Sequence, residues 1–155
     1  MLPDVLCSFK IPYAIVFFAA SSFVATEEKG YSGKGYVKDY SAESADLSIE
    51  IEIPEPGDYM IRFTGSNGNG PHDTFCTIRS LFLDGKDYGT VILEAYGDWA
   101  EWTHSNHVIF HNLSAGKHTL SLKFNPEERG FDNNMSFNKK NLNDWFIDYL
   151  TVVRL

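Results

Sequence analysis

Strict alternation of apolar and polar residues in one short segment constrains the fold of this chain more than any other feature. Residues 47–53, LSIEIEI, place leucine or isoleucine at every odd position and serine or glutamate at every even one. Successive side chains of a strand point to opposite faces, so this period of two predicts a strand with one face on a core and one in water. The PEPGD turn that follows predicts a hairpin, with YMIRFTG (residues 59–65) as the partner strand.

The rest of the chain repeats short strand-like runs separated by turn residues. CTIRSLFLDG ends on Asp84 and Gly85, a strong signal for a tight turn, and GTVILEAY continues the pattern. TLSLKF alternates again, and WFIDYLTVV closes the chain as a largely apolar strand. No window has the periodicity of an amphipathic helix, and no repeat or linker divides the 155 residues. Short strands at this spacing predict one all-β domain, a β-sandwich or barrel.

The first 22 residues form an apolar segment with two interpretations. IPYAIVFFAASSFVA (residues 11–25) is too short and too polar at its end for a membrane span. It fits the apolar region of a secretion signal, although only Lys10, offset by Asp4, precedes it. The alternative is a buried first strand from Tyr13 to Ala20, rich in β-branched and aromatic residues. Residues 1–22 are therefore a leader or an atypical first strand, and residues 23–155 are the domain.

Charge and aromatic content narrow the classes of partner. The formal net charge is -8, and the isoelectric point is about 5.0. Nucleic-acid binding needs clustered lysine and arginine, so this balance argues against it. Aromatic residues make up 15% of the chain, more than one small core needs, which suggests that some of them contact a ligand. Neutral ligands, or cations held by carboxylates, fit this composition better.

The order of the motifs resembles a known family. GYSGKGYV (residues 30–37), then LFLDG, GDWAEWTH and WFIDYLTVV, is similar to the carbohydrate-binding modules of families 35 and 6. The resemblance covers Phe23 to Leu155 and implies a jelly-roll β-sandwich of the galactose-binding-like type. It also implies non-catalytic binding of a polysaccharide or oligosaccharide. Such modules are usually attached to secreted glycoside hydrolases or related enzymes, so the resemblance implies an extracellular or cell-surface protein with a catalytic domain in cis or in trans.

The resemblance also implies a structural calcium ion near the first and last strands. Its last-strand aspartate has a counterpart in Asp148. The two first-strand carboxylates do not, because Phe18 and Ala20 stand where they would be expected. Calcium takes six to eight oxygen ligands, so the loss of two carboxylates predicts a weakened calcium site.

Six residues are candidates for contact with a sugar. Sugars present apolar C–H faces edged by hydroxyl groups, and a site for them needs an aromatic platform with polar groups at its rim. Trp99 lies between a turn and a strand, where an indole can project, and the family places an aromatic residue near Tyr36. Related modules supply an asparagine just before the last strand, which implicates Asn143. The rim candidates, for hydroxyl or carboxylate groups of the ligand, are His72, Asp73, Arg79 and Asn143. For each of these residues a structural role, in the core, in a turn or in an ion pair, is the alternative.

Patterns typical of enzymes are weak. His107 and His111 share one strand face, but at about 3.3 Å per residue they lie roughly 13 Å apart, too far for one metal ion. No pair of carboxylates suggests a glycosidase site, and no nucleophile motif occurs. The glycines of GYSGKG lack the features of a phosphate-binding loop. The remaining alternative is a structural or protein-interaction sandwich that has lost its sugar and calcium sites. Exposure of Trp99, Tyr36 and Asn143 on one patch would favour sugar binding over that alternative.

Overall fold

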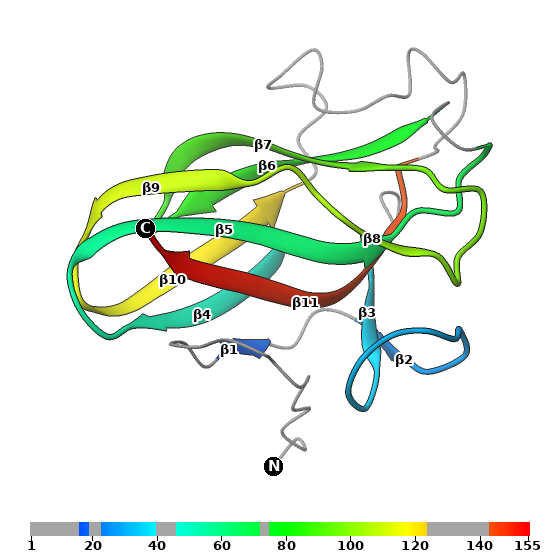
Figure 1. The fold of residues 1–155 in the computed structure, drawn as a ribbon, viewed down its shortest axis with the longest axis horizontal. Coiled ribbons are helices and arrows are strands. Elements are labelled where there is room, and N and C mark those ends of the chain that lie inside the picture. Colours follow the sequence, from blue (N-terminus) through cyan, green and yellow to red (C-terminus); the bar gives the residue numbers. More distant parts are fainter. Residues whose placement is uncertain (1–15, 19–22, 40–45, 72–74, 124–142) are drawn as a thin grey trace.

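The computed structural model shows a sandwich of two antiparallel β-sheets (Figure 1). No helix occurs among the residues that it describes. These are residues 16–18, 23–39, 46–71, 75–123 and 143–155. The all-β sandwich predicted from the sequence is therefore confirmed. No helix within these ranges is long and apolar enough to cross a membrane.

One layer is a five-stranded sheet in the order β1-β4-β10-β6-β7. Its strands are β1 (Val16–Phe18), β4 (Leu47–Ile53), β6 (Cys76–Leu83), β7 (Lys86–Glu94) and β10 (Gly116–Lys123). The turn between β6 and β7 is the one signalled by Asp84 and Gly85, which have φ angles of 51° and 78°. Two successive residues in this left-handed region form the turn that tight hairpins favour.

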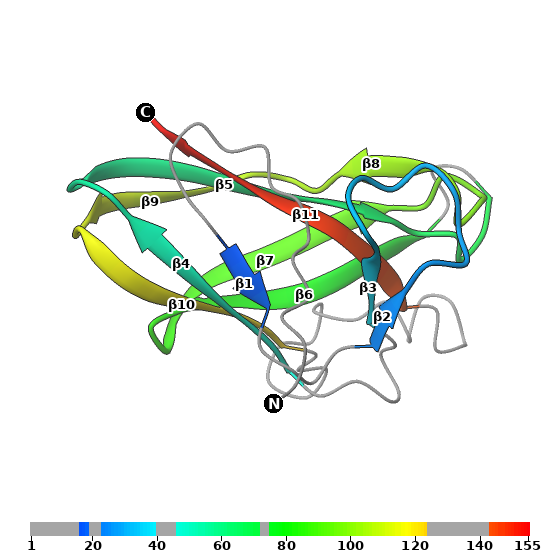
Figure 2. The same cartoon turned by 90° about the horizontal axis from the view of Figure 1, so that it is seen from below.

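The other layer is a six-stranded sheet in which β2-β3-β11-β5-β8 are neighbours and β9 also pairs with β5. Its strands are β2 (Phe23–Ala25), β3 (Tyr36–Asp39), β5 (Gly57–Ser66), β8 (Trp102–His104), β9 (Val108–Leu113) and β11 (Trp145–Arg154). β11 lies at the centre of this sheet, between β3 and β5. In Figure 2, turned by 90°, β2 and β3 again lie at one end of the sandwich beside β11.

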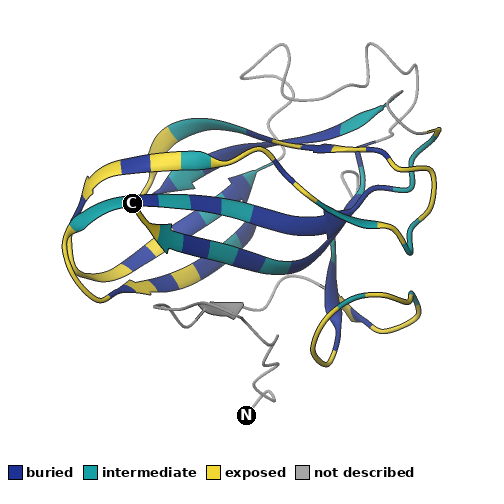
Figure 3. Cartoon of the chain, viewed as in Figure 1, coloured by how far each residue is buried: buried dark blue, intermediate teal, exposed yellow. Residues whose placement is uncertain are grey.

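The core fills the space between the two sheets. In β4 the odd positions 47, 49, 51 and 53 are buried and the glutamates at 50 and 52 are exposed, as the alternation predicts. Leu120 of β10 lies opposite Ile49, and both are fully buried. Figure 3 shows the same alternation along β10. The apolar face of each sheet thus covers that of the other, which holds the two layers together.

One pairing differs from the sequence expectation. The segment 59–65 lies in β5, which pairs with β8, β9 and β11 and not with β4. The hairpin predicted at PEPGD is therefore wrong. Both strands need their apolar faces on the core, and the turn meets this need by carrying the chain from one sheet to the other. Local sequence indicates a turn but does not distinguish these two outcomes.

The N-terminal segment contributes a strand to the five-stranded sheet. Val16–Phe18 pairs antiparallel with β4, with Val16 opposite Ile51. This strand falls within Tyr13–Ala20, the range of the first-strand interpretation. The residues on either side of it, 1–15 and 19–22, lie outside the described part of the chain.

Candidate functional site

The loop between β2 and β3, residues 26–35, folds back against β8 at one end of the sandwich (Figures 1 and 2). Trp102 donates a hydrogen bond from Nε1 to the carbonyl oxygen of Lys29 at 2.7 Å. Gly30 has a φ of 87°, and a Cβ at this position would lie 3.0 Å from the Trp102 ring. Glycine therefore permits both the turn and the close approach of the indole.

Ser32 joins the same loop to the last strand. Its backbone N–H donates to Asp148 Oδ2 at 2.8 Å, and its hydroxyl donates to Asp148 Oδ1 at 3.0 Å. Asp148 is only 3% exposed. Burial raises the pKa of its carboxyl above the ordinary value, against the opposite effect of the two hydrogen bonds from Ser32. This pair fixes the position of the loop relative to β11.

Five aromatic side chains gather beneath and beside this loop. We call them the aromatic cluster: Tyr31, Tyr36, Trp99, Trp102 and Phe146. The Tyr36 ring is at the centre, with centroids 5.3 Å from Tyr31, 5.2 Å from Trp102 and 5.0 Å from Phe146. The Trp99 ring lies 4.3 Å from the Phe146 ring at an interplanar angle of 31°. Tyr36 and Phe146 are buried, whereas Tyr31, Trp99 and Trp102 keep part of their surface in water.

The segment that follows β5 runs beside Trp99. A Cβ on Gly68 would lie 2.6 to 2.7 Å from three atoms of the Trp99 ring, so the indole packs directly on the backbone at this glycine. The Asn69 side chain donates to the carbonyl oxygen of Asp144 at 2.7 Å. The buried Asn67 side chain donates to the carbonyl oxygen of Leu93 at 2.9 Å. The segment is thus tied to the start of β11 and the end of β7, next to a half-exposed tryptophan.

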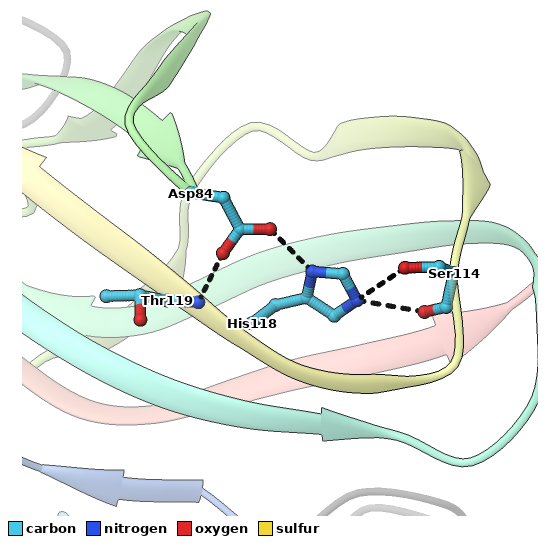
Figure 4. A network of polar contacts seen from close by, with 4 residues as sticks. All are labelled: Asp84, Ser114, His118 and Thr119. Atoms are coloured by element: carbon cyan, nitrogen blue, oxygen red, sulfur yellow. Dashed lines mark hydrogen bonds and ion pairs between the residues drawn. The ribbon is translucent and has the colours of Figure 1, made fainter.

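A serine, a histidine and an aspartate lie together at the other end of the sandwich, where the turns into β7 and β10 approach each other (Figure 4). His118 Nδ1 lies 2.6 Å from Asp84 Oδ2, and His118 Nε2 lies 3.4 Å from Ser114 Oγ. This order resembles a hydrolase triad, but Nε2 lies closer, at 2.9 Å, to the carbonyl oxygen of Ser114. A nitrogen that donates to a carbonyl cannot accept the serine proton, so this histidine is not placed as a general base. The network joins two turns and offers no nucleophile.

No family model matches the chain. A cycloisomaltooligosaccharide glucanotransferase of Niallia circulans is 31% identical over 107 residues, which are 69% of this chain and 10% of that enzyme. A 1,6-alpha-glucosyltransferase of Sporosarcina globispora is 24% identical over 113 residues, 72% of this chain and 8% of that enzyme. The chain thus spans about a tenth of the length of these curated relatives.

Solved structures show the fold that the chain shares with known modules. A family 35 carbohydrate-binding module from Cellvibrio japonicus superposes with a TM-score of 0.64 at 21% identity, over 88% of this chain and 86% of that one. The chain has the fold of a family 35 carbohydrate-binding module. The match covers nearly all of both chains, so the sandwich corresponds to a whole module of this fold.

This fold gives Tyr36 a different place from the one that the resemblance implied. Tyr36 is 0% exposed, because Tyr31, Trp102 and Phe146 surround its ring. Its hydroxyl donates to the Glu27 carboxylate and accepts from the Glu28 backbone N–H, both at 3.3 Å. Tyr36 therefore supports the 26–35 loop from below, and the expectation that it stacks on a sugar is corrected.

Asn143 and Arg79 are also buried, at 0% and 1% exposure. Asn143 Oδ1 accepts from the Ile78 backbone N–H at 2.7 Å, and Nδ2 donates to the Ile78 carbonyl at 3.4 Å. The side chain thereby pairs with the β6 backbone as a neighbouring strand would. Arg79 donates to the same carbonyl at 3.0 Å and lies over the Trp145 ring at 5.4 Å. Neither side chain is placed to read ligand hydroxyl groups, which corrects the expectation for both.

Trp99 is the predicted contact residue that retains an exposed part. It is half-buried against Phe146 and Gly68, beside the loops described above. His72 and Asp73 lie outside the described residues, so their predicted roles stay predictions. Trp99 and Tyr36 thus lie in one cluster. The Trp99 ring is partly exposed, whereas the Tyr36 ring is buried and packs beneath the loop.

The donor set around Asp148 does not fit the calcium site that this fold family implies. The loop presents an N–H and an O–H to the carboxylate, and an N–H cannot ligate a cation. Within the described ranges, no three acidic, histidine or cysteine side chains gather closely enough to hold a metal ion. The weakened calcium site that the sequence predicts stays a prediction.

Sequence reasoning missed Ser32. A serine between two glycines indicates only a turn, and nothing local to it shows that its partner lies 116 residues away. Trp102 follows Trp99 by three residues, and the local sequence does not indicate which of the two indoles is buried. In the structure both are half-exposed members of one cluster. β8 is only three residues long, so its sequence contains no alternation that could indicate which ring is exposed.

Proposed function

We propose that this chain is a non-catalytic module that binds α-1,6-linked glucose chains and holds an associated enzyme close to them. The observation that carries the proposal is the combination of a family 35 module fold with relatives named for 1,6-glucosyl and cycloisomaltooligosaccharide transfer. The chain corresponds to about a tenth of those enzymes, the size of an accessory module rather than of a catalytic domain. Tethering raises the effective concentration of the polysaccharide, so a weak single site is sufficient.

The proposed contact surface is the half-exposed side of the aromatic cluster. Tyr31, Trp99 and Trp102 have rings that are partly in water and partly supported by buried rings. Their supports leave them few alternative positions, so little conformational entropy is lost when a sugar stacks on them. Of the three, Trp102 already uses its indole N–H on Lys29. We therefore assign the main stacking role to Trp99 and a supporting one to Tyr31.

Affinity electrophoresis in gels containing dextran tests this function. Retardation of the wild-type chain is expected, and Trp99→Ala should weaken retention by on the order of tenfold, the effect of losing about 1.4 kcal/mol. A matched control is Trp145→Phe, a ring change at a fully buried core position, which should leave retention unchanged if the fold is intact. Equal mobility of wild type and Trp99→Ala in dextran, with normal folding of both, would contradict the proposal. Gels containing an α-1,4-glucan distinguish the linkage.

A structural or protein-interaction sandwich is the second candidate. The observation that favours it is the burial of Tyr36, Asn143 and Arg79, three of the residues expected at the sugar. Under this alternative, no polysaccharide in the gel slows the chain, although substitution of a buried residue such as Asn143 still lowers the free energy of unfolding. The same electrophoresis therefore separates the two candidates.

The proposed polysaccharide ligand suggests where the protein acts. We propose that the module acts outside the cell or at its surface, where polysaccharides of this class are encountered. Detection of the chain in the culture medium, compared with a cytoplasmic marker protein, tests this part of the proposal.

A further inference from the structure

Several contacts among the described residues attach the 26–35 loop to the sandwich, and one of them is an ion pair of 3.3 Å between Lys38 of β3 and Glu27. Trp102 holds the carbonyl of Lys29, the Tyr36 hydroxyl holds the Glu27 carboxylate and the Glu28 N–H, and Asp148 holds Ser32. Of these contacts, the hydrogen bonds between Ser32 and Asp148 join the loop to the central strand of the six-stranded sheet. The position of the loop on that sheet therefore depends on the Ser32 and Asp148 pair.

The loop donates hydrogen bonds to Asp148, whereas a loop in a cation site would contribute oxygen lone pairs. Calcium collects six to eight oxygen lone pairs, and loops contribute to such sites through carbonyl oxygens. Here the loop directs two hydrogens, on N and Oγ of Ser32, at the two carboxylate oxygens at 2.8 and 3.0 Å. The carboxylate is thereby satisfied by the protein itself, as a buried charge must be. A calcium ion at this position would have to displace the Ser32 N–H.

We infer that hydrogen bonds from Ser32 to Asp148 replace a divalent cation as the attachment of the 26–35 loop, so that the loop keeps its place without calcium. The inference concerns the folded chain alone and does not depend on which ligand the chain binds. Asp148 thus acts as a hydrogen-bond acceptor for a loop and not as a metal ligand. The aromatic cluster below the loop supplies the apolar part of the same attachment.

Thermal unfolding with and without calcium tests this inference. The full chain, treated with EDTA and then dialysed, should melt at the same temperature in 2 mM calcium chloride as in EDTA. Hydrogen bonds to a charged group are worth more than neutral ones, so Ser32→Ala should lower the Tm by on the order of 5 °C in both buffers. Asp148→Asn should lower it in both buffers as well. Glu52→Gln, which removes an exposed carboxylate from β4, is the control for loss of charge and should leave the Tm unchanged.

A second readout reports on the loop itself. The Trp102 indole N–H, bonded to Lys29, gives an NMR signal that is identified by its absence in Trp102→Phe. This signal should not move on addition of calcium, and its exchange with solvent should become faster in Ser32→Ala. A calcium-dependent rise in Tm of about 5 °C or more that disappears in Asp148→Asn, together with a calcium-dependent shift of the Trp102 signal, would overturn the inference. The wild-type calcium titration decides the question even if Asp148→Asn does not fold.

Discussion

His118 shows how a single side chain can join two distant turns. Both of its ring nitrogens face acceptors, the carboxylate of Asp84 at 2.6 Å and the carbonyl of Ser114 at 2.9 Å (Figure 4). Only the doubly protonated imidazolium can donate to both. Burial acts to lower the pKa of His118, but the hydrogen bonds to Asp84 and Ser114 outweigh it and raise that pKa above the ordinary value. Burial acts to raise the pKa of Asp84, but the hydrogen bonds from His118 and from the Thr119 N–H outweigh it and lower that pKa below the ordinary value.

The stability of the chain should therefore depend on pH through this residue. A pKa raised by folding stabilises the folded state fully below the unfolded value of 6.5 and loses that contribution as pH rises through the folded pKa. The free energy of unfolding by urea should fall from pH 6 to pH 8 in wild type and change less in His118→Gln. Exposed His107→Gln serves as the matched control and should behave like wild type. Parallel pH profiles for wild type and His118→Gln would contradict this account.

Substitution of Asn143 tests whether this side chain contributes to stability or to ligand binding. Its amide satisfies the N–H and C=O of Ile78 in a buried place, at distances of 2.7 and 3.4 Å. Asn143→Ala leaves those groups without that partner and should cost about 1–3 kcal/mol of unfolding free energy. Chemical denaturation measures the loss. A variant of normal stability that no longer binds glycan would instead assign Asn143 to the ligand.

At the scale of elements, strands were easier to predict than their partners. The alternation of 47–53 and the turn at Asp84 and Gly85 gave β4 and the β6–β7 hairpin correctly, because both depend on local chemistry. The partner of residues 59–65 was wrong, because either sheet would bury the same apolar face. The pairing of Ser32 with Asp148 had no local signal at all. Site residues were harder still, since Tyr36 and Trp99 differ in exposure only through their neighbours in space.

The close approach of β5 and β11 can be tested by substitution at Gly65. A Cβ on Gly65 would collide with the Phe146 carbonyl oxygen, which belongs to the backbone and cannot move aside. Gly65→Ala should therefore destabilise the chain by more than about 2 kcal/mol, as other severe steric changes do. Gly85→Ala is the comparison, because its Cβ would meet nothing within 4 Å and only the φ of 78° is unfavourable. We expect about 1–2 kcal/mol for that variant. Equal losses in urea denaturation would contradict the proposed close approach.

At the scale of the whole molecule, the two ends of the sandwich have different roles. One end carries the Asp84, Ser114 and His118 network, which joins turns and contributes stability. The other end carries the 26–35 loop, the 66–71 segment and the aromatic cluster with its three half-buried rings. The family resemblance predicted the fold of the module. It did not predict which rings are buried, because that depends on how the 26–35 loop packs on Trp102 and Phe146.

An NMR titration of the chain with isomaltotriose tests the central claim most directly. Sugar binding at the aromatic end should shift the Trp99 indole signal, together with backbone signals of residues 26–35, 66–71 and 96–102. The signals of β4 and β10, two strands of the five-stranded sheet, should stay in place. Saturable shifts confined to the first group are the result that this account predicts. An unchanged spectrum at millimolar sugar, or shifts confined to the β4 and β10 face, would contradict it.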